Sequence, residues 1–370
     1  MAEAEFTSET RKNLINKISD AVGGKIDQPL WPFLWLADIP QLEEISRYPD
    51  LRTYLAGLAI RIERSQLLPR WTQRTRDRTP SLTSPPKPSM MMFSEITAAE
   101  DTPASPTSSM KSRLDTRPKK TVELCRMRDK KRCIITGADD PVEVAHIFPF
   151  SMRGLQTPDI VNDTYNPWSV LRMFWTQERV DAWYNAITGP LATESVQNLM
   201  CFAPHVHKYH ERAYFALEPV KEDPESHTLT VRFHWLPYMT KLHDLKLNTR
   251  PSFPCGVGCG RRIRLWNVES GEEILSDTLI HITAHDEIPL PDPMLLQLQW
   301  ILHRIIALAG GAEAVAEPYN NNDYHDESYP EFNDEDDMNL DLTLSTTSSS
   351  HGQLSVRTQD FVPGLALPVH

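Results

Sequence analysis

Two stretches of the sequence decide the fold: residues 132–150, RCIITGADDPVEVAHIFPF, and residues 197–212, QNLMCFAPHVHKYHER. In the first stretch, a short apolar run leads into GADDP at 137–141, which has the composition of a turn. A second apolar run then resumes. We therefore expect a β-hairpin that pairs residues 132–136 with residues 142–148.

The second stretch predicts a helix that begins after Pro204 and carries several histidines. His207 and Glu211 are four residues apart and His207 and His210 are three apart, so either pair can share a helix face. An imidazole and a carboxylate on one face can hold a divalent metal ion. With a further histidine opposite them to activate water, these groups would suffice for metal-assisted phosphodiester hydrolysis.

At these residues the chain resembles the HNH endonucleases, which are also called ββα-metal or His-Me finger nucleases. Three motifs occur in the family's order: Arg-Cys-x-x-Thr-Gly at 132–137, Ala-His-Ile-x-Pro at 145–149 and Asn-Leu-x-Cys-x-x-Pro-x-x-His at 198–207. They look closest to a branch found in fungal proteins. The resemblance covers about residues 121–220 and says nothing of the remaining chain.

The resemblance implies a role for each residue of the motifs. His146 would be the general base that takes a proton from the attacking water, and Asn198 would orient that histidine by hydrogen bonding. His207 would bind one divalent metal ion, with Glu211 standing where relatives often have Asp. Mg²⁺ is the expected ion, with Mn²⁺ or Zn²⁺ as alternatives. The implied partner is nucleic acid, DNA rather than RNA, and the products are a 5′-phosphate and a 3′-hydroxyl.

One departure from the family's pattern concerns the metal site. Many HNH enzymes carry Asp or His directly before the base, and here that position is Ala145. Another group completes the ligand sphere, or His146 is itself a ligand, or metal binding is weak. The rival hypotheses are a catalytically degenerate HNH fold that binds nucleic acid or protein, and an interaction scaffold whose finger is purely structural.

Two further expectations concern packing around the finger. The long segment between His146 and Asn198 is rich in aromatic residues, such as Trp168 and Trp175, and should form a helical cover over the finger. We expect Cys133 and Cys201 to face each other at the finger's base as small apolar side chains.

The net charge of −12 does not exclude nucleic acid, because the charge is unevenly distributed. Acidic residues concentrate from residue 318 to the end, and bases concentrate in residues 111–132. The basic run adjoins the finger, as a phosphate-contacting surface should. The candidate nucleic-acid-binding residues are Arg126, Arg128, Lys130, Lys131 and Arg132.

We predict an α+β protein in which a ββα-metal finger is embedded in a larger α+β domain. No stretch has the pattern of a signal peptide or a membrane span, so we expect a soluble intracellular protein without a membrane partner, in nucleus or cytoplasm. The expected parts are a helical N-terminal region at 1–70, a disordered Pro/Ser/Thr-rich linker at 71–118, the HNH domain at 119–220, an α+β extension packed on it at 221–317, and an acidic disordered tail at 318–370.

Overall fold

The computed structural model describes residues 4–27, 29–72, 119–153, 164–188, 192–237, 245–253, 262–285 and 288–310. All of these residues belong to one compact unit, Met1–Pro318. The predicted linker, from residue 73 onward, and the predicted acidic tail lie outside the described residues. No helix in the described part of the chain is long and apolar enough to span a bilayer.

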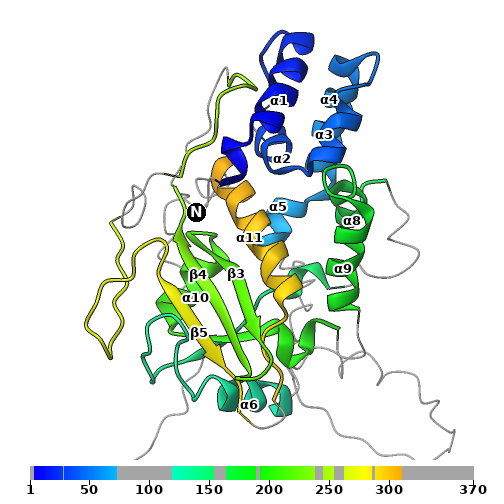
Figure 1. The fold of residues 1–370 in the computed structure, drawn as a ribbon. Coiled ribbons are helices and arrows are strands. Elements are labelled where there is room, and N and C mark those ends of the chain that lie inside the picture. Colours follow the sequence, from blue (N-terminus) through cyan, green and yellow to red (C-terminus); the bar gives the residue numbers. More distant parts are fainter. Residues whose placement is uncertain are drawn as a thin grey trace, which may run out of the picture. The chain divides into compact units, whose positions relative to one another are not determined.

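The N-terminal region is helical, as the apolar spacing predicts (Figure 1). Ser8 caps the first helix by accepting a hydrogen bond from the Arg11 amide, and Asp50 caps the fourth in the same way. Trp31 and Trp35 are buried, and their indole N–H groups donate to the carbonyls of Thr249 and Leu247. The elements are η1 (Ala4–Thr7), α1 (Glu9–Val22), α2 (Leu30–Leu36), α3 (Ile39–Ile45), α4 (Leu51–Ser65) and α5 (Leu67–Trp71).

The finger consists of β1 (Glu143–His146), β2 (Leu199–Phe202) and α10 (Pro204–Glu211), with α6 (Lys119–Arg128) packed against both strands. β1 and β2 are antiparallel, with Glu143 opposite Phe202 and His146 opposite Leu199. The two strands and the following helix form the predicted ββα unit.

The predicted hairpin between residues 132–136 and 142–148 is wrong. Residues 133–137 form a tight turn instead, in which the Gly137 amide donates to the carbonyl of Cys133 at 2.8 Å. Gly137 has φ of 72°, a conformation that glycine adopts without steric cost. The partner of β1 is therefore β2, which is distant in sequence.

The segment between the two strands is helical, as predicted, and its helices pack mainly on α4 and on the helix at 293–308. Its aromatic side chains enter the main hydrophobic core, where Trp168, Trp175 and Trp183 are almost fully buried. The elements of this segment are η2 (Phe150–Met152), α8 (Pro167–Leu171), α9 (Gln177–Ile187), η3 (Ala192–Glu194) and η4 (Val196–Asn198).

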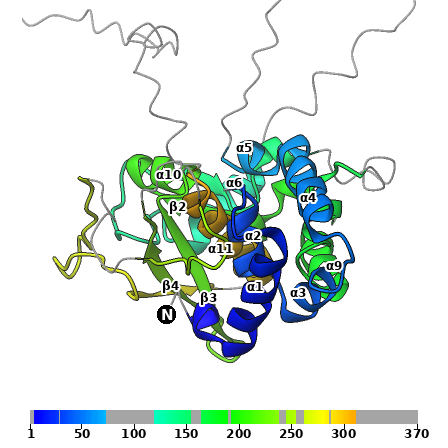
Figure 2. The same ribbon diagram turned by 90° about the horizontal axis from the view of Figure 1, so that it is seen from above.

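The C-terminal part of the unit is an antiparallel sheet with a long helix packed on it (Figures 1 and 2). The sheet order is β3 (Phe215–Asp223), β4 (Thr228–Trp235), β5 (Leu279–Thr283). Helix α11 (Pro293–Leu308) packs on β3 and also contacts α2, α5 and α9. Its side chains are buried on nearly all sides, which makes it the central helix of the core.

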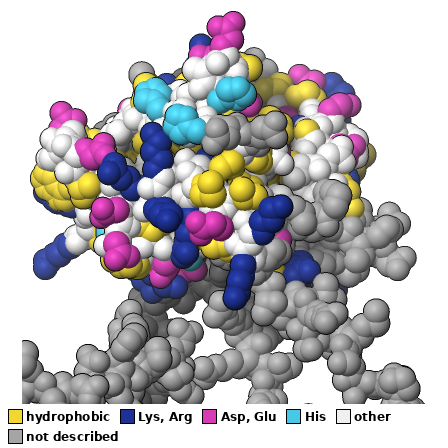
Figure 3. Space-filling view, turned by 90° about the horizontal axis from the view of Figure 1, so that it is seen from below, with side chains coloured by type: hydrophobic (Ala, Val, Ile, Leu, Met, Phe, Trp, Pro, Cys, Tyr) yellow, Lys and Arg dark blue, Asp and Glu magenta, His cyan; other side chains and the backbone are white. Residues whose placement is uncertain are grey.

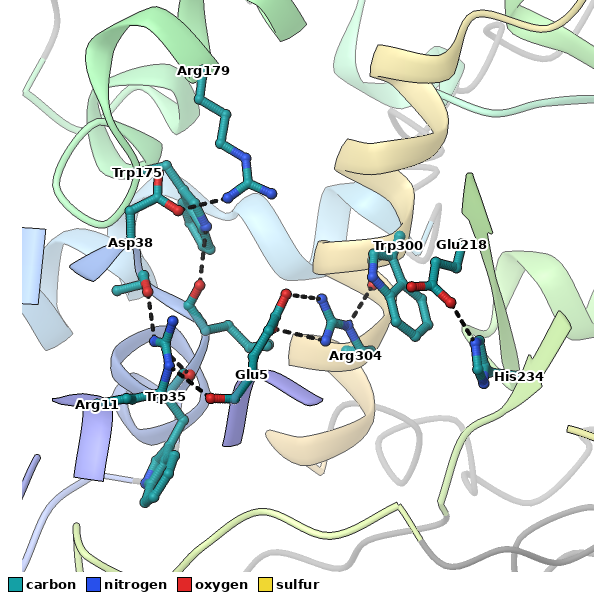
Figure 4. A network of polar contacts seen from close by, with 12 residues as sticks. Glu5, Arg11, Trp35, Asp38, Trp175, Arg179, Glu218, His234, Trp300 and Arg304 are labelled. Carbon is teal, nitrogen blue, oxygen red and sulfur yellow. Dashed lines mark hydrogen bonds and ion pairs between the residues drawn. The ribbon is translucent and has the colours of Figure 1, made fainter. Parts of the chain in front are cut away.

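Polar contacts join the N-terminal region to α11 and α9 (Figure 4). Arg304 on α11 donates to the carboxylate of Glu5 at 3.0 Å and lies over the ring of Trp300. Arg11 donates to the carbonyls of Trp35 and Ala37, which end helix α2. The helical N-terminal region thus shares one core with the sheet and α11.

Candidate active site

His207 lies on α10 between two carboxylates. Its Nδ1 is 2.6 Å from Oε2 of Glu143, and its Nε2 is 3.4 Å from Oε1 of Glu211. The predicted pairing of His207 with Glu211 on one helix face is therefore present. Glu143, on β1, is an additional partner that the motif did not identify.

This arrangement fits a divalent cation. Two ligands at about 2.0–2.2 Å from one ion are separated by about 3–3.5 Å, and Nε2 of His207 and Oε1 of Glu211 are 3.4 Å apart. A metal-binding histidine commonly donates its other ring N–H to a carboxylate, which fixes the orientation of the ring. Glu143 is in position to accept that hydrogen bond.

Glu143 also bears on the missing ligand at Ala145. Side chains two residues apart on a strand point to the same face of the sheet. Glu143 therefore places a carboxylate on the face of β1 that Ala145 occupies, two positions earlier along the strand. Ala145 itself is buried and offers no donor atom.

His146 lies at the other end of β1 and has a carboxylate of its own. Its Nε2 is 3.0 Å from Oε1 of Glu194, and the two side chains are 5% and 9% exposed. Glu194 belongs to η3, outside the motifs that carry the resemblance, so sequence reasoning did not identify it. The ring of Phe150 lies beside His146 with 6.0 Å between ring centroids.

Asn198 holds the backbone that follows His146 in place by side-chain hydrogen bonds. Its Oδ1 accepts a hydrogen bond from the Phe148 amide at 2.7 Å. Its Nδ2 donates to the carbonyl of Phe148 at 3.0 Å and to that of Thr193 at 2.9 Å. The side chain is fully buried, so all three bonds are shielded from water.

The remaining histidines of α10 lie outside this group. His205 is exposed, and its ring is next to Tyr209. His210 is buried between Phe202, Phe215 and His303, and burial holds its pKa well below the usual value. His210 is therefore a neutral core residue, and of the two pairs that could share a helix face, only His207 and Glu211 are in contact.

The expected contact between Cys133 and Cys201 is also wrong. Cys201 lies beside Cys125 of α6, with 3.8 Å between the sulfur atoms, and Asp129 is close to both. These three side chains could hold a metal ion by their spacing. Asp129, however, is already bound to Arg128 and to the amide of Cys201, and hydrogen bonding and burial raise the pKa of the Cys201 thiol. The cluster therefore serves to anchor α6 to β2.

Arg128 does not lie on a nucleic-acid-facing surface. Its side chain is buried and forms an ion pair with Asp129 at 2.7 Å. It also donates to the carbonyl oxygens of Val196 and Leu199. The prediction that Arg128 contacts phosphate is therefore wrong for this structure, since its donors are used inside the protein.

The other basic candidates are accessible at or beyond the end of α6. Lys130 and Lys131 are exposed and both have φ of 56°, and Arg132 pairs with Glu269. Cations at a helix C-terminus are also favoured by the helix dipole, so their position has a structural reason as well. On the face seen from below, Lys and Arg side chains are interspersed with acidic ones (Figure 3).

Comparison with known families identifies the finger. Residues 133–218 match the family model HNH_2, described as HNH endonuclease. No curated protein and no solved structure matches the chain. The matched span contains β1, β2 and α10, so the chain contains an HNH domain, which indicates nuclease activity and nucleic-acid binding in general. Members of this family typically use a divalent metal ion.

Proposed function

We propose that the HNH domain at residues 133–218 is a metal-dependent endonuclease that hydrolyses phosphodiester bonds of DNA. The observation that carries the proposal is the grouping of Glu143, His207 and Glu211, because it provides an oriented imidazole and a carboxylate at the spacing of two metal ligands. The family match gives this grouping its chemical context.

In this proposal each residue of the finger has a separate task. His146 takes a proton from the attacking water at Nδ1, since Nε2 is engaged with Glu194. Asn198 holds the backbone after His146 in place through its bonds to Phe148. His207 and Glu211 would hold one divalent ion, Mg²⁺ in preference to Mn²⁺ or Zn²⁺. When bound, that ion supplies electrostatic stabilisation of the charge that develops on the phosphate.

Lys130, Lys131, Arg126 and Arg132 are proposed to contact the phosphate backbone of the substrate. Lys130 and Lys131 are exposed residues, which supports this role. Both residues adopt the left-handed backbone conformation, in which a non-glycine residue costs about 1–2 kcal/mol. A glycine would avoid this cost, so the presence of lysine at both positions favours a use for their charge.

The test is nicking of supercoiled plasmid DNA in the presence of Mg²⁺ or Mn²⁺, with His146→Ala as the inactive control and a structured RNA as the alternative substrate. We expect open-circular DNA to appear with the wild type only. The absence of nicking under all conditions would refute the nuclease proposal.

A second candidate is a degenerate HNH fold that binds nucleic acid without cutting it. The burial of Ala145 at the usual ligand position and the low exposure of His146 favour this alternative. It predicts retarded migration of DNA in a gel with no nicking by the wild type.

A further inference from the structure

Glu194 forms a buried pair with His146 that the HNH motifs do not account for. The Oε1 and Nε2 atoms are 3.0 Å apart, and both side chains are at least nine-tenths buried. A carboxylate so little exposed to water interacts strongly with its neighbour because the local dielectric constant is low. The pair therefore fixes which ring nitrogen of His146 faces the carboxylate.

The position of Glu194 is fixed by the same side chain that fixes His146. Asn198 bonds the backbone of Phe148, two residues after His146, and also the carbonyl of Thr193, directly before Glu194. One buried amide thus connects the backbone that carries the base to the backbone that carries the carboxylate. This connection explains why η3, at the end of the long segment between the strands, lies against the end of β1.

We propose that Glu194 is a positioning residue that acts through His146, which rests on the proposed nuclease function. Its carboxylate accepts a hydrogen bond from Nε2–H and so selects the tautomer whose basic nitrogen is Nδ1. Carboxylates that hold a catalytic histidine in this way also stabilise the imidazolium that forms during the reaction.

In the hydrolysis step, one proton moves through His146. One proton passes from the attacking water to Nδ1 of His146, while the water oxygen forms a bond to phosphorus. The bond from phosphorus to the 3′-oxygen breaks, and that oxygen keeps the electron pair and takes a proton from solvent. Glu194 stays ionised throughout, so its task is electrostatic and geometric.

The chain offers a matched control for this pair. Glu218 on β3 lies 3.0 Å from Nε2 of His234 on β4, and the His234 side chain is 3% exposed (Figure 4). This second Glu–His pair lies in the three-stranded sheet, outside the finger. Glu218 is 25% exposed and also pairs with Arg232, and Glu218→Gln removes a Glu–His contact without touching His146.

The first experiment measures plasmid cleavage against pH for the wild type, Glu194→Gln and Glu218→Gln. We expect Glu194→Gln to lower kcat by about 10² or more, as loss of acid–base assistance does, with KM nearly unchanged. We also expect the acid limb of its pH profile to move to lower pH, because the substitution removes a negative charge that favours the imidazolium form of His146. Glu218→Gln should retain the rate and profile of the wild type.

The second experiment records the imidazole nitrogen resonances of His146 by NMR, without DNA or metal, using His146→Gln for assignment. We expect the wild type to carry its proton on Nε2 and Glu194→Gln to change the tautomer ratio. This measurement tests the Glu194 contact whether or not the protein cuts DNA. A wild-type ring protonated on Nδ1 alone would overturn the proposal.

The outcomes separate the two proposals. A wild type that does not cut DNA refutes the nuclease function, and the NMR tautomer then decides the Glu194 contact alone. If the wild type cuts DNA and Glu194→Gln matches its rate and pH profile, the role of Glu194 is refuted while the nuclease function stands. Equal losses in Glu194→Gln and Glu218→Gln would also refute it, because they would show a general effect of losing a buried pair.

Discussion

Asn198→Asp replaces the amide nitrogen of a fully buried side chain with an oxygen of nearly the same size. The substitution keeps the bond from the Phe148 amide to Oδ1 at 2.7 Å. It removes the donor that now serves the carbonyls of Phe148 and Thr193, at 3.0 and 2.9 Å. A buried carbonyl left without a donor costs about 1–3 kcal/mol, so the ionised variant, which leaves two of them, should lose about 2–6 kcal/mol of the free energy of unfolding, whereas a protonated carboxyl group can still donate to one of them.

The introduced carboxyl group adds a pH dependence of known sign. Burial raises the pKa of a carboxyl group above its unfolded value of about 3.9. The folded variant then keeps its proton over a pH range in which the unfolded chain has released it. The stability of the variant, relative to the wild type, should therefore fall as the pH rises above about 4.

Urea unfolding followed by tryptophan fluorescence, at pH 4.5 and pH 8, measures both effects. Asn198→Ala is the control, since it loses the same donor without gaining a titrating group. The anchoring role of Asn198 is refuted if Asn198→Asp stays within about 0.5 kcal/mol of the wild type, the range of ordinary surface substitutions. Equal losses at the two pH values would contradict the argument from burial.

Three further predictions test other parts of the structure. Arg128→Gln should lower the free energy of unfolding by about 3–5 kcal/mol, because it leaves Asp129 buried without its partner. Lys131→Gln should leave urea unfolding unchanged. It should instead reduce the slope of log K for DNA binding against log salt concentration by about 1. His207→Ala should weaken Mn²⁺ binding at least about 10-fold, as measured by electron paramagnetic resonance. His146→Ala should leave Mn²⁺ binding unaltered, and equal losses in the two variants would make His146 a ligand. Burial lowers the pKa of His303 to about 4 from 6.5, so between these pH values the unfolded chain binds a proton that the folded chain does not. The free energy of unfolding should therefore fall as the pH drops from about 6.5 towards 4, by at most about 1.4 kcal/mol per pH unit from this group. The control variant His303→Gln should remove that part of the pH dependence.

The elements of the finger could be predicted because their signals are local. Pro204 and the spacing of His207 and Glu211 predict a helix with both side chains on one face, and the structure has this helix. The caps at Ser8 and Asp50 likewise mark the starts of α1 and α4. In each case the chemistry that forms the element lies within a few residues of it.

The pairing of β1 could not be predicted from such signals. The turn sequence after Cys133 favours a hairpin with the nearest apolar run, and a strand of four residues carries little information about its partner. The long segment at 147–198 separates the two strands in sequence, so no local signal links them. Glu194 was missed for the same reason, because its contact with His146 is made only in the folded chain.

The error at Arg128 had an available signal. Thr121, Cys125 and Arg128 are the buried residues of α6 and follow each other at helical spacing. A count of charges along the segment treats Arg128 like its neighbours, whereas this spacing places it on the face that packs inward. The face of the helix, and not the density of charge, decides which arginine is available to a phosphate.

The contact between Glu5 and Arg304 has a consequence for synthesis of the protein on the ribosome. The two residues are 299 positions apart, so the first helices emerge long before α11 can pack against them. At about 5–20 residues per second, the nascent chain spends about 15–60 s with these helices lacking their partner. During that time the tryptophans of α2 have no complete core to enter, and we expect the emerging chain to need chaperones until α11 has been translated.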